Sequence, residues 1–189
     1  RALANALQKE ELIPLDGKAV LEVGCGSGGV LLELLSLGAK AACISGVDLL
    51  PDRLAVAQAR LPGLALQNAD GRHLPYLAQT FDLLLQFTVF SSILDSAIWQ
   101  AMAQEMLRVL RPNGAIVWYD FWLNPTNPHT RSIRPSEICA LFPGCRIRFA
   151  RVTLAPPLAR RLVPFSWTLA LLLEKLRFLN THYLAIIRP

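Results

Sequence analysis

A cluster of glycines between an apolar run and a helical segment constrains this chain more than any other feature. Residues 19–23 form a short apolar run, as expected for a buried strand, and they lead directly into Gly24-Cys25-Gly26-Ser27-Gly28-Gly29. Helical composition follows over residues 29–37. A chain that turns this sharply with a ligand against its backbone has no room for Cβ atoms. We therefore predict a strand, a ligand-binding loop and a helix, in that order.

Strand-like and helix-like segments alternate along the rest of the chain, which favours a parallel sheet with helices on both faces. Strands are predicted over residues 19–23, 43–49, 64–68, 81–87, 115–119, 146–154 and 182–187. Helices are predicted over residues 2–11, 29–37, 52–60, 96–110, 135–142 and 157–176. The predicted fold class is α/β, doubly wound and Rossmann-like, within a single domain of residues 1–189, because this length is too short for two ordinary domains.

Composition excludes several other classes. Apolar residues make up 53% and charged residues 17%, which excludes intrinsic disorder and coiled coil. No uninterrupted apolar run reaches the roughly 18 residues that a membrane span needs. The four cysteines form no C-x-x-C pair and have no histidine at ligand spacing, so we expect reduced thiols and no structural zinc site. With no signal peptide at Arg1, the expected location is cytoplasmic.

Charge is distributed unevenly along the chain. Residues 1–130 carry 9 Lys/Arg and 12 Asp/Glu, a net charge of −3, whereas residues 131–189 carry 10 and 2, a net charge of +8. A basic end is typical of proteins that meet nucleic acid, anionic lipid or a phosphorylated substrate. It is equally compatible with an ordinary solvated surface.

The glycine loop has two interpretations. Gly24, Gly26 and Gly29 satisfy G-x-G-x-x-G, the pattern of a dinucleotide-binding loop. However, Glu22 stands two residues before the first glycine, where its charge would repel the phosphates of a dinucleotide. A cofactor that carries a sulfonium and an ammonium group would instead favour a negative charge at this position.

Five motifs in order then point to one family. They are Val20-Leu21-Glu22-Val23-Gly24-Cys25-Gly26-Ser27-Gly28, Val47-Asp48-Leu49, Asn68-Ala69-Asp70-Gly71, Phe81-Asp82-Leu83-Leu84-Leu85 and the turn Arg111-Pro112-Asn113-Gly114. With these motifs the chain resembles the class I S-adenosylmethionine-dependent methyltransferases over about residues 1–120, and it leans toward their quinone-biosynthesis branch. The resemblance implies a cofactor-binding part in residues 1–120 and a substrate-side part in residues 121–189. It also implies that the last strand runs antiparallel between the fifth and sixth.

The resemblance implies roles for individual residues. The backbone of Gly24, Cys25, Gly26 and Gly28 would lie along the methionine moiety of S-adenosyl-L-methionine, with Glu22 ordering the loop. Asp48, followed by Leu49, would accept hydrogen bonds from the ribose hydroxyls. Asp70 would accept from the adenine amino group, and the Gly71 N–H would face a ring nitrogen. Gln86 would sit where the methyl group points.

Acceptor residues are expected beyond the fourth and fifth strands. The predicted apolar wall consists of Phe87, Phe90, Tyr119, Phe121 and Trp122. Candidates for a catalytic base are His129, Tyr119 and Asp120, and we expect no metal because Asp120 is the only acidic ligand available there. The stretch Gln86-Phe87-Thr88-Val89-Phe90 lacks the Asn/Asp-Pro-Pro-Tyr or -Phe of enzymes that methylate exocyclic or amide nitrogens, which favours oxygen or carbon in a small-molecule, lipid or glycan acceptor.

Alternative functions remain open from the sequence. One is a nicotinamide-dependent oxidoreductase, and another is a non-catalytic cofactor-binding protein on the same fold. The apolar helix predicted over residues 157–176 is expected to cover a sheet face near the last strand. Alternatively, Arg160 and Arg161, with Arg131 and Arg134, would form a cationic rim for peripheral membrane contact or an anionic acceptor. Nucleic acid is disfavoured because aromatic residues are not interleaved with the basic ones.

Overall fold

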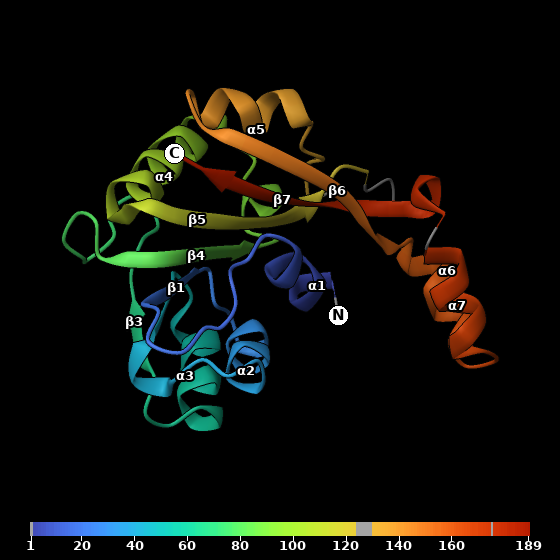
Figure 1. The fold of residues 1–189 in the computed structure, drawn as a ribbon, viewed down its shortest axis with the longest axis horizontal. Helices are drawn as coiled ribbons and strands as arrows, with labels where there is room; N and C mark the ends of the chain where they lie inside the picture. Colours follow the sequence, from blue (N-terminus) through green and yellow to red (C-terminus); the bar gives the residue numbers. More distant parts are fainter. Residues whose placement is uncertain (1, 124–129, 175) are drawn as a thin grey trace.

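The protein folds around one seven-stranded sheet with the strand order β3-β2-β1-β4-β5-β7-β6 (Figure 1). The computed structural model describes residues 2–123, 130–174 and 176–189. The strands are β1 (Val20–Val23), β2 (Ile44–Asp48), β3 (Ala65–Asn68), β4 (Phe81–Phe87), β5 (Leu110–Phe121), β6 (Arg146–Leu154) and β7 (Asn180–Arg188).

Strand pairing confirms the predicted topology. Strands β1 to β5 pair in parallel, and β7 runs antiparallel between β5 and β6. Parallel strands joined by right-handed crossovers bring their carboxyl ends to one edge of the sheet. Phe121, at the end of β5, pairs with His182 near the start of β7, so residues 155–174 and 176–179 also leave the sheet at this edge. This carboxyl edge therefore collects the loops that can form a site.

Helices cover both faces of the sheet (Figure 1). They are α1 (Ala2–Lys9), α2 (Gly29–Ser36), α3 (Pro51–Arg60), α4 (Ser96–Val109), α5 (Pro135–Leu141), α6 (Pro156–Leu162) and α7 (Trp167–Glu174). On one face, Leu7 of α1 and Leu31 of α2 pack with Leu83 and Leu85 of β4. On the other face, α4 and α5 pack on Leu84 and its neighbours. The two cores follow from the alternation of side chains along each strand.

Two predicted boundaries are wrong for local reasons. Strand β5 begins at Leu110 rather than at residue 115, because Leu110 already pairs with Phe81 before an irregularity in the register. The single helix predicted over residues 157–176 is two short helices, α6 and α7, on either side of Pro164. Proline lacks the N–H that a continuous helix needs, and its ring clashes with the preceding turn.

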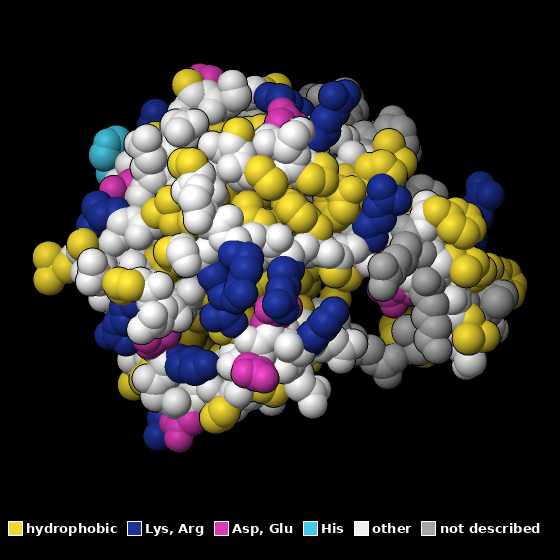
Figure 2. All heavy atoms as spheres, turned by 45° about the horizontal axis from the view of Figure 1, so that its top comes forward, with side chains coloured by type: hydrophobic (Ala, Val, Ile, Leu, Met, Phe, Trp, Pro, Cys, Tyr) yellow, Lys and Arg dark blue, Asp and Glu magenta, His cyan; other side chains and the backbone are white. Residues whose placement is uncertain are grey.

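The segment that contains these helices does not cover a sheet face, so that prediction is also wrong. We call residues 156–174 and 176–179 the arm. Phe165 and Trp167 of the arm expose 89% and 57% of their surface, and Figure 2 shows apolar side chains on the lobe that the arm forms at the right of the molecule. No helix among the described residues is long and apolar enough to cross a bilayer. High apolar content in the arm therefore does not correspond to burial in the core.

Phe90 lies in the core rather than at a surface that an acceptor could reach. Its side chain is fully buried, with its ring centroid 4.2 Å from that of Trp118 and 6.2 Å from that of Trp99. Phe90 belongs to a 3-10 turn, Phe90–Ser92, which follows β4 and directs the ring under α4. Phe90 therefore packs in the core and does not form part of the predicted acceptor wall.

We expect Phe90→Ala to lower the free energy of unfolding by about 3–5 kcal/mol, since it removes a buried ring and leaves a cavity. Urea denaturation of the wild type and the variant measures this loss. The exposed substitution Leu77→Ala, in the loop before β4, is the control and should change stability by less than about 0.5 kcal/mol. A Phe90→Ala variant as stable as wild type would contradict this packing role.

Candidate functional site

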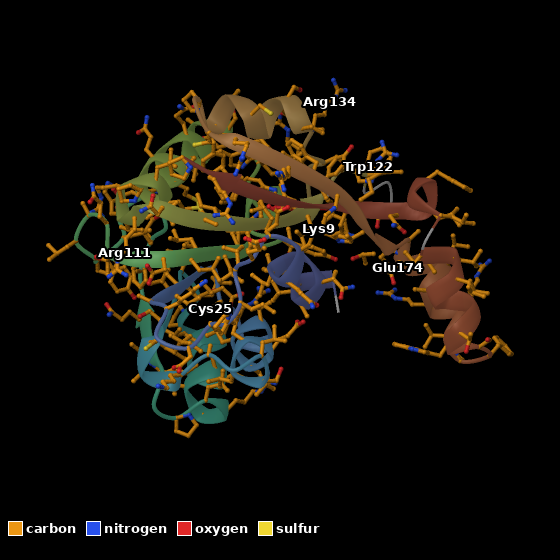
Figure 3. All side chains as sticks on the ribbon, in the orientation of Figure 1. Lys9, Cys25, Arg111, Trp122, Arg134 and Glu174 are labelled. Atoms are coloured by element: carbon orange, nitrogen blue, oxygen red, sulfur yellow. The ribbon has the colours of Figure 1, made fainter. Side chains whose placement is uncertain are left out.

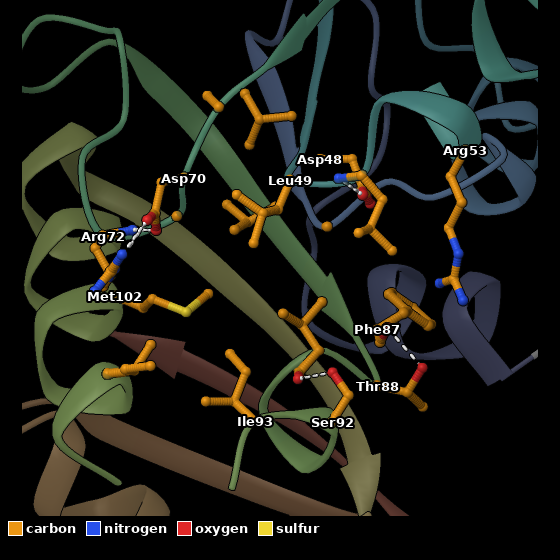
Figure 4. A pocket seen from close by; sticks show the side chains of 18 residues that line it. Asp48, Leu49, Arg53, Asp70, Arg72, Phe87, Thr88, Ser92, Ile93 and Met102 are labelled. Carbon is orange, nitrogen blue, oxygen red and sulfur yellow. Dashed lines mark hydrogen bonds and ion pairs between the residues drawn. The ribbon is translucent and has the colours of Figure 1, made fainter. Parts of the chain in front are cut away.

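A cavity of about 350 Å³ opens at the carboxyl edge of the sheet, within the size range of small-molecule sites. Its walls come from the ends of β1 and β2, the loop after β3, the residues after β4, and helices α3 and α4. Figure 4 shows Asp70, Arg72 and Met102 at one end, and Arg53, Phe87 and Thr88 at the other. The cavity therefore crosses the carboxyl edge of the sheet, from the face that α4 covers to the face on which Phe87 lies.

The glycine loop forms one wall of this cavity because its backbone conformation requires glycine. Gly24 has a φ of +74°, and a Cβ built there would lie 2.3 Å from Cγ2 of Val89. Gly28, the residue before α2, has a φ of +79°, and its Cβ would lie 2.7 Å from Cδ1 of Leu61. Both positions combine a left-handed backbone with a close neighbour, so any side chain here would move the loop.

The first N–H groups of the loop are bound inside the protein. The N–H groups of Gly24 and Cys25 both donate to the carbonyl of Val47, at 2.8 and 2.9 Å. The N–H of Gly26 donates to Oδ2 of Asp48 at 2.7 Å, and the N–H of Leu50 donates to Oδ1 of the same carboxylate at 2.9 Å. These loop N–H groups are therefore not free to bind a pyrophosphate, as a dinucleotide-binding loop would require.

Glu22 is a buried carboxyl beneath the loop. It exposes 2% of its surface, and its Oε2 has no hydrogen-bond partner among the described residues. Burial raises its pKa well above the ordinary value, and the nearby charge of Asp48 raises it further. A positively charged ligand group close to this pair would stabilise both ionised carboxylates, so the site suits a cation better than an anion.

Two arginines stand at opposite ends of the cavity. Nη2 and Nε of Arg72 donate to Oδ2 of Asp70 at 2.6 and 2.9 Å, and this guanidinium holds the pKa of Asp70 below its ordinary value. Arg53, in the first turn of α3, extends beside Phe87 and Thr88 (Figure 4). The Arg72 side chain uses Oδ2, and the Arg72 backbone N–H donates to Oδ1 at 2.9 Å, so one lone pair of Oδ1 remains for a further donor.

The structure brings about half of the predicted cofactor residues to the cavity surface. Those that line the cavity are Gly24, Asp48, Leu49, Asp70 and Gly71. Those that lie behind its wall are Glu22, Cys25, Gly26, Gly28 and Gln86. Gln86 is fully buried, where its Oε1 accepts from the N–H of Val89 at 3.2 Å. It therefore shapes the segment that lines the cavity without itself facing it.

The Cys25 side chain is buried within the loop. Burial, together with the charges of Glu22 and Asp48, raises the pKa of its thiol to about 12. A thiol with this pKa remains protonated at neutral pH, so Cys25 is not a nucleophile.

An aromatic stack continues from the cavity toward the arm. Phe87 lines the cavity, and its ring stacks on that of Tyr119 with centroids 5.0 Å apart. Tyr119 stacks in turn on His182 at 4.6 Å, and His182 contacts Phe121 at 3.9 Å. Burial lowers the pKa of His182 to about 4, so this ring is neutral at physiological pH. Of the predicted acceptor residues, Phe87 alone lines the cavity, and Tyr119 supports it from behind.

Thr153 holds Tyr119 in this stack. Its Oγ1 lies 2.7 Å from the Tyr119 hydroxyl, although Thr153 belongs to the distant strand β6. Val152 and Leu154 pair with β7, whereas Thr153 has a φ of +65° and no partner in the register. A β-branched residue with positive φ is unusual, and here it marks a local break in the β6–β7 pairing, without a change of register, that turns the side chain toward Tyr119.

Trp122 lies away from the cavity, beyond the end of β5 (Figure 3). Its Nε1 donates to the carbonyl of Asn180 at 2.8 Å, and the Arg151 guanidinium lies 4.4 Å from its ring centroid. These contacts place it against β6 and β7, so the structure does not bring it to the predicted acceptor wall. The reason is that β5 continues to Phe121, two residues past its predicted end.

Neither described candidate for a catalytic base lines the cavity. Burial raises the pKa of Tyr119 to about 12. Asp120 exposes 1% of its surface on the opposite face of the sheet, where its oxygens accept from the N–H groups of Ser91 and Phe121. His129 lies outside the described residues. Proton removal from an acceptor is therefore not assigned to a residue of the described cavity.

Sequence reasoning missed Arg53, Thr88 and Met102, all of which line the cavity. Thr88 directly follows β4, and Arg53 sits in the first turn of the helix that follows Asp48. Residues at these two positions lie at the carboxyl edge of any doubly wound sheet. Their place directly after a strand, or in the first turn of the next helix, could therefore have predicted that they line the cavity. Met102 fits the apolar stripe of α4, and nothing in that pattern distinguishes a cavity wall from the core.

Comparison with known proteins identifies the family. The family model described as "Methyltransferase domain" matches residues 20–114, about half of the chain, and this match contains the glycine loop, Asp48 and Asp70. The chain therefore belongs to the methyltransferase domain family, which confirms the predicted family. This assignment also decides between the two interpretations of the glycine loop.

Two curated relatives and one solved structure illustrate this membership. A phthiotriol/phenolphthiotriol dimycocerosates methyltransferase of Mycobacterium leprae (strain TN) is 33% identical over 117 residues, covering 61% of this chain and 41% of that protein. A norajmaline N-methyltransferase of Rauvolfia serpentina is 30% identical over 128 residues, covering 64% and 41%. An S-adenosylmethionine-dependent methyltransferase from Mesorhizobium loti has the same fold, with a TM-score of 0.68, 18% identity, and coverage of 100% of this chain and 98% of that chain.

The matches cover about two fifths of the length of these curated relatives. They establish the domain family and not the acceptor of the whole protein.

We expect Asp120 to make stability fall as the pH rises through the acid range. Burial raises its pKa from 3.8 to about 6, so the folded protein binds this proton more tightly than the unfolded chain does. The free energy of unfolding then decreases by up to about 3 kcal/mol between pH 4 and pH 6 from this group.

The measurement is urea denaturation at several pH values for the wild type and Asp120→Asn. Subtracting the two curves cancels the contributions of Glu22 and His182, whose pKa values burial also shifts. The stability of the wild type relative to the variant should decrease across this window. A difference that does not depend on pH would show that Asp120 is ionised throughout.

Proposed function

We propose that this protein transfers a methyl group from S-adenosyl-L-methionine to an oxygen or carbon atom of a small-molecule or lipid acceptor. The observation that carries the proposal is the cavity that joins the glycine loop, Asp48 and Asp70 at the carboxyl edge of a methyltransferase domain. Asp48 and Asp70 lie at the ends of neighbouring strands, so their acceptor oxygens face one ligand.

The residues present fit such a cofactor. Each oxygen of the Asp48 carboxylate accepts one backbone N–H, so lone pairs remain on both oxygens for two ribose hydroxyls. Oδ1 of Asp70 would accept from the adenine amino group, while Arg72 keeps this carboxylate ionised. A bound ammonium or sulfonium group would favour ionisation of Glu22, whose pKa burial and the charge of Asp48 raise.

When bound, the cofactor supplies a methyl group that is already activated as part of a sulfonium. The chain then has to hold the acceptor in line and exclude water, and proximity provides most of the rate enhancement. Phe87, with Val89 and Ile93, offers an apolar wall for this purpose, while Thr88 and Arg53 add polar groups at the same end of the cavity. We therefore assign acceptor binding to the Phe87 and Arg53 end.

The proposed acceptor is a molecule with a large apolar part. The Mycobacterium leprae relative is named for phthiotriol and phenolphthiotriol dimycocerosates, and we add quinols to the candidates because of the resemblance to the quinone-biosynthesis branch. Gln86-Phe87-Thr88-Val89-Phe90 supports oxygen or carbon as the acceptor atom, because it lacks the proline motif of enzymes that methylate exocyclic or amide nitrogens. The Rauvolfia serpentina relative, an N-methyltransferase, makes an amine nitrogen the second candidate.

A cytoplasmic location is part of this proposal, and the four free cysteines are consistent with a reducing compartment. A lipid acceptor would also require contact with a membrane surface. The experiment is a screen with methyl-labelled cofactor against quinols, hydroxylated lipids, sterols, glycans and amines. Label in an acceptor of the first three kinds supports the proposal, whereas label only in amines would replace it with the second candidate.

We expect Asp48→Ala to weaken the binding of S-adenosyl-L-methionine about ten- to hundredfold, because hydrogen bonds to a charged group are worth about 1.5–3 kcal/mol. Titration calorimetry measures this change, with melting temperatures checked because Asp48 also binds two loop N–H groups. Asp52→Ala is the matched control, since Asp52 is exposed in the first turn of α3 and does not line the cavity. Equal affinity of wild type and Asp48→Ala would exclude the ribose role.

A further inference from the structure

The arm exposes more large apolar side chains than a water-facing segment of its size needs. Phe165, Phe178, Trp167 and Leu172 expose 89%, 71%, 57% and 55% of their surface. All four lie within the same short stretch of chain, which forms a separate lobe at the right of the molecule (Figure 2). Contiguous exposed apolar surface of this kind marks a site of interaction with a protein or a membrane.

Basic residues accompany this apolar surface. Arg160 and Arg161 are both exposed in the last turn of α6, and neither forms an ion pair with a described residue. Arg151 lies over the ring of Trp122 where β6 approaches the arm. Residues 131–189 carry 10 Lys/Arg against 2 Asp/Glu, so this part of the chain attracts an anionic surface.

We propose that the arm docks on an anionic lipid bilayer, with Phe165 and Trp167 inserted among the headgroups and acyl chains and with Arg160 and Arg161 against lipid phosphates. The choice of lipid as the partner rests on the proposed function. Aromatic residues beside arginines are the combination that favours the membrane interface. A second copy of the chain fits less well, because it would place the same unpaired arginines of two copies near each other.

The position of the arm relates this docking to the cavity. The arm leaves the sheet at the carboxyl edge, where the cavity lies. Glu174, at the end of α7, accepts through Oε1 from the N–H of Thr153 at 3.2 Å (Figure 3 labels Glu174), and Thr153 binds Tyr119. Tyr119 stacks on Phe87 in the cavity wall. A docked arm therefore holds the acceptor end of the cavity close to the bilayer, where an apolar acceptor would enter.

The experiment is co-sedimentation of the full chain with two kinds of vesicle at low and moderate salt. One kind is phosphatidylcholine alone, and the other contains equal parts of phosphatidylcholine and phosphatidylglycerol. We expect binding to the anionic vesicles that weakens as salt screens the arginines. Phe165→Glu should lower the partition coefficient about tenfold or more, and Arg160→Gln with Arg161→Gln should lower it about fivefold per arginine.

Matched control variants test whether vesicle binding depends on the arm or on any exposed apolar or basic residue. Leu77→Glu places the same charge on another exposed apolar position, in the loop before β4. Lys9→Gln with Arg146→Gln removes the same number of positive charges from exposed positions on α1 and β6. Both controls should leave vesicle binding within about twofold of wild type. Phe165 is 89% exposed, so its replacement leaves the melting temperature unchanged.

Three outcomes would overturn the proposal. These are no binding to anionic vesicles at low salt, a Phe165→Glu variant that binds as wild type does, and a wild-type dimer that Phe165→Glu converts to a monomer in sedimentation velocity. Calorimetry with S-adenosyl-L-methionine keeps the two proposals apart. Cofactor binding without vesicle binding contradicts the docking of the arm alone, and vesicle binding without cofactor binding contradicts the methyl-transfer function alone.

Discussion

The carboxylate of Asp48 fixes two chain connections at the carboxyl edge of the sheet. One oxygen accepts from the N–H of Gly26 in the glycine loop, and the other accepts from the N–H of Leu50 just before α3. The same side chain thus determines the path of the loop after β1 and of the connection after β2. Because buried backbone N–H groups need acceptors, a carboxylate here stabilises both connections while it faces the cavity. The shape of the site and its charge depend on this one group.

Local patterns predicted the parts of the structure that local chemistry determines. Glycines with positive φ at residues 24 and 28 could be recognised because other residues are strained there. Asp48 and Asp70 could be placed because strand ends of a parallel sheet meet at one edge. The antiparallel insertion of β7 was not visible in any local pattern. It came from the resemblance to a family, since pairing between distant strands leaves little trace in the residues of either strand.

The aromatic residues show where prediction from sequence failed. Phe87 and Tyr119 are register partners on adjacent strands, so their side chains share one face and stack. Phe90 and Trp122 come after the ends of those strands, where alternation no longer predicts the direction of a side chain. A 3-10 turn buries Phe90, and two added residues of β5 move Trp122 beyond the cavity. Composition predicted an aromatic wall, whereas backbone geometry determined which of these rings form it.

In the arm too, composition alone did not predict where the side chains lie. Apolar composition predicted burial, and burial in the core is what a globular chain ordinarily gains from such residues. The arm instead begins with Pro156, is interrupted near Pro164, and reaches the site through Glu174 and Thr153. A basic segment that keeps large apolar side chains exposed to water has a higher free energy than one that buries them. Its free energy would fall on contact with an anionic apolar surface, and such a surface is also where the proposed apolar acceptor would be found.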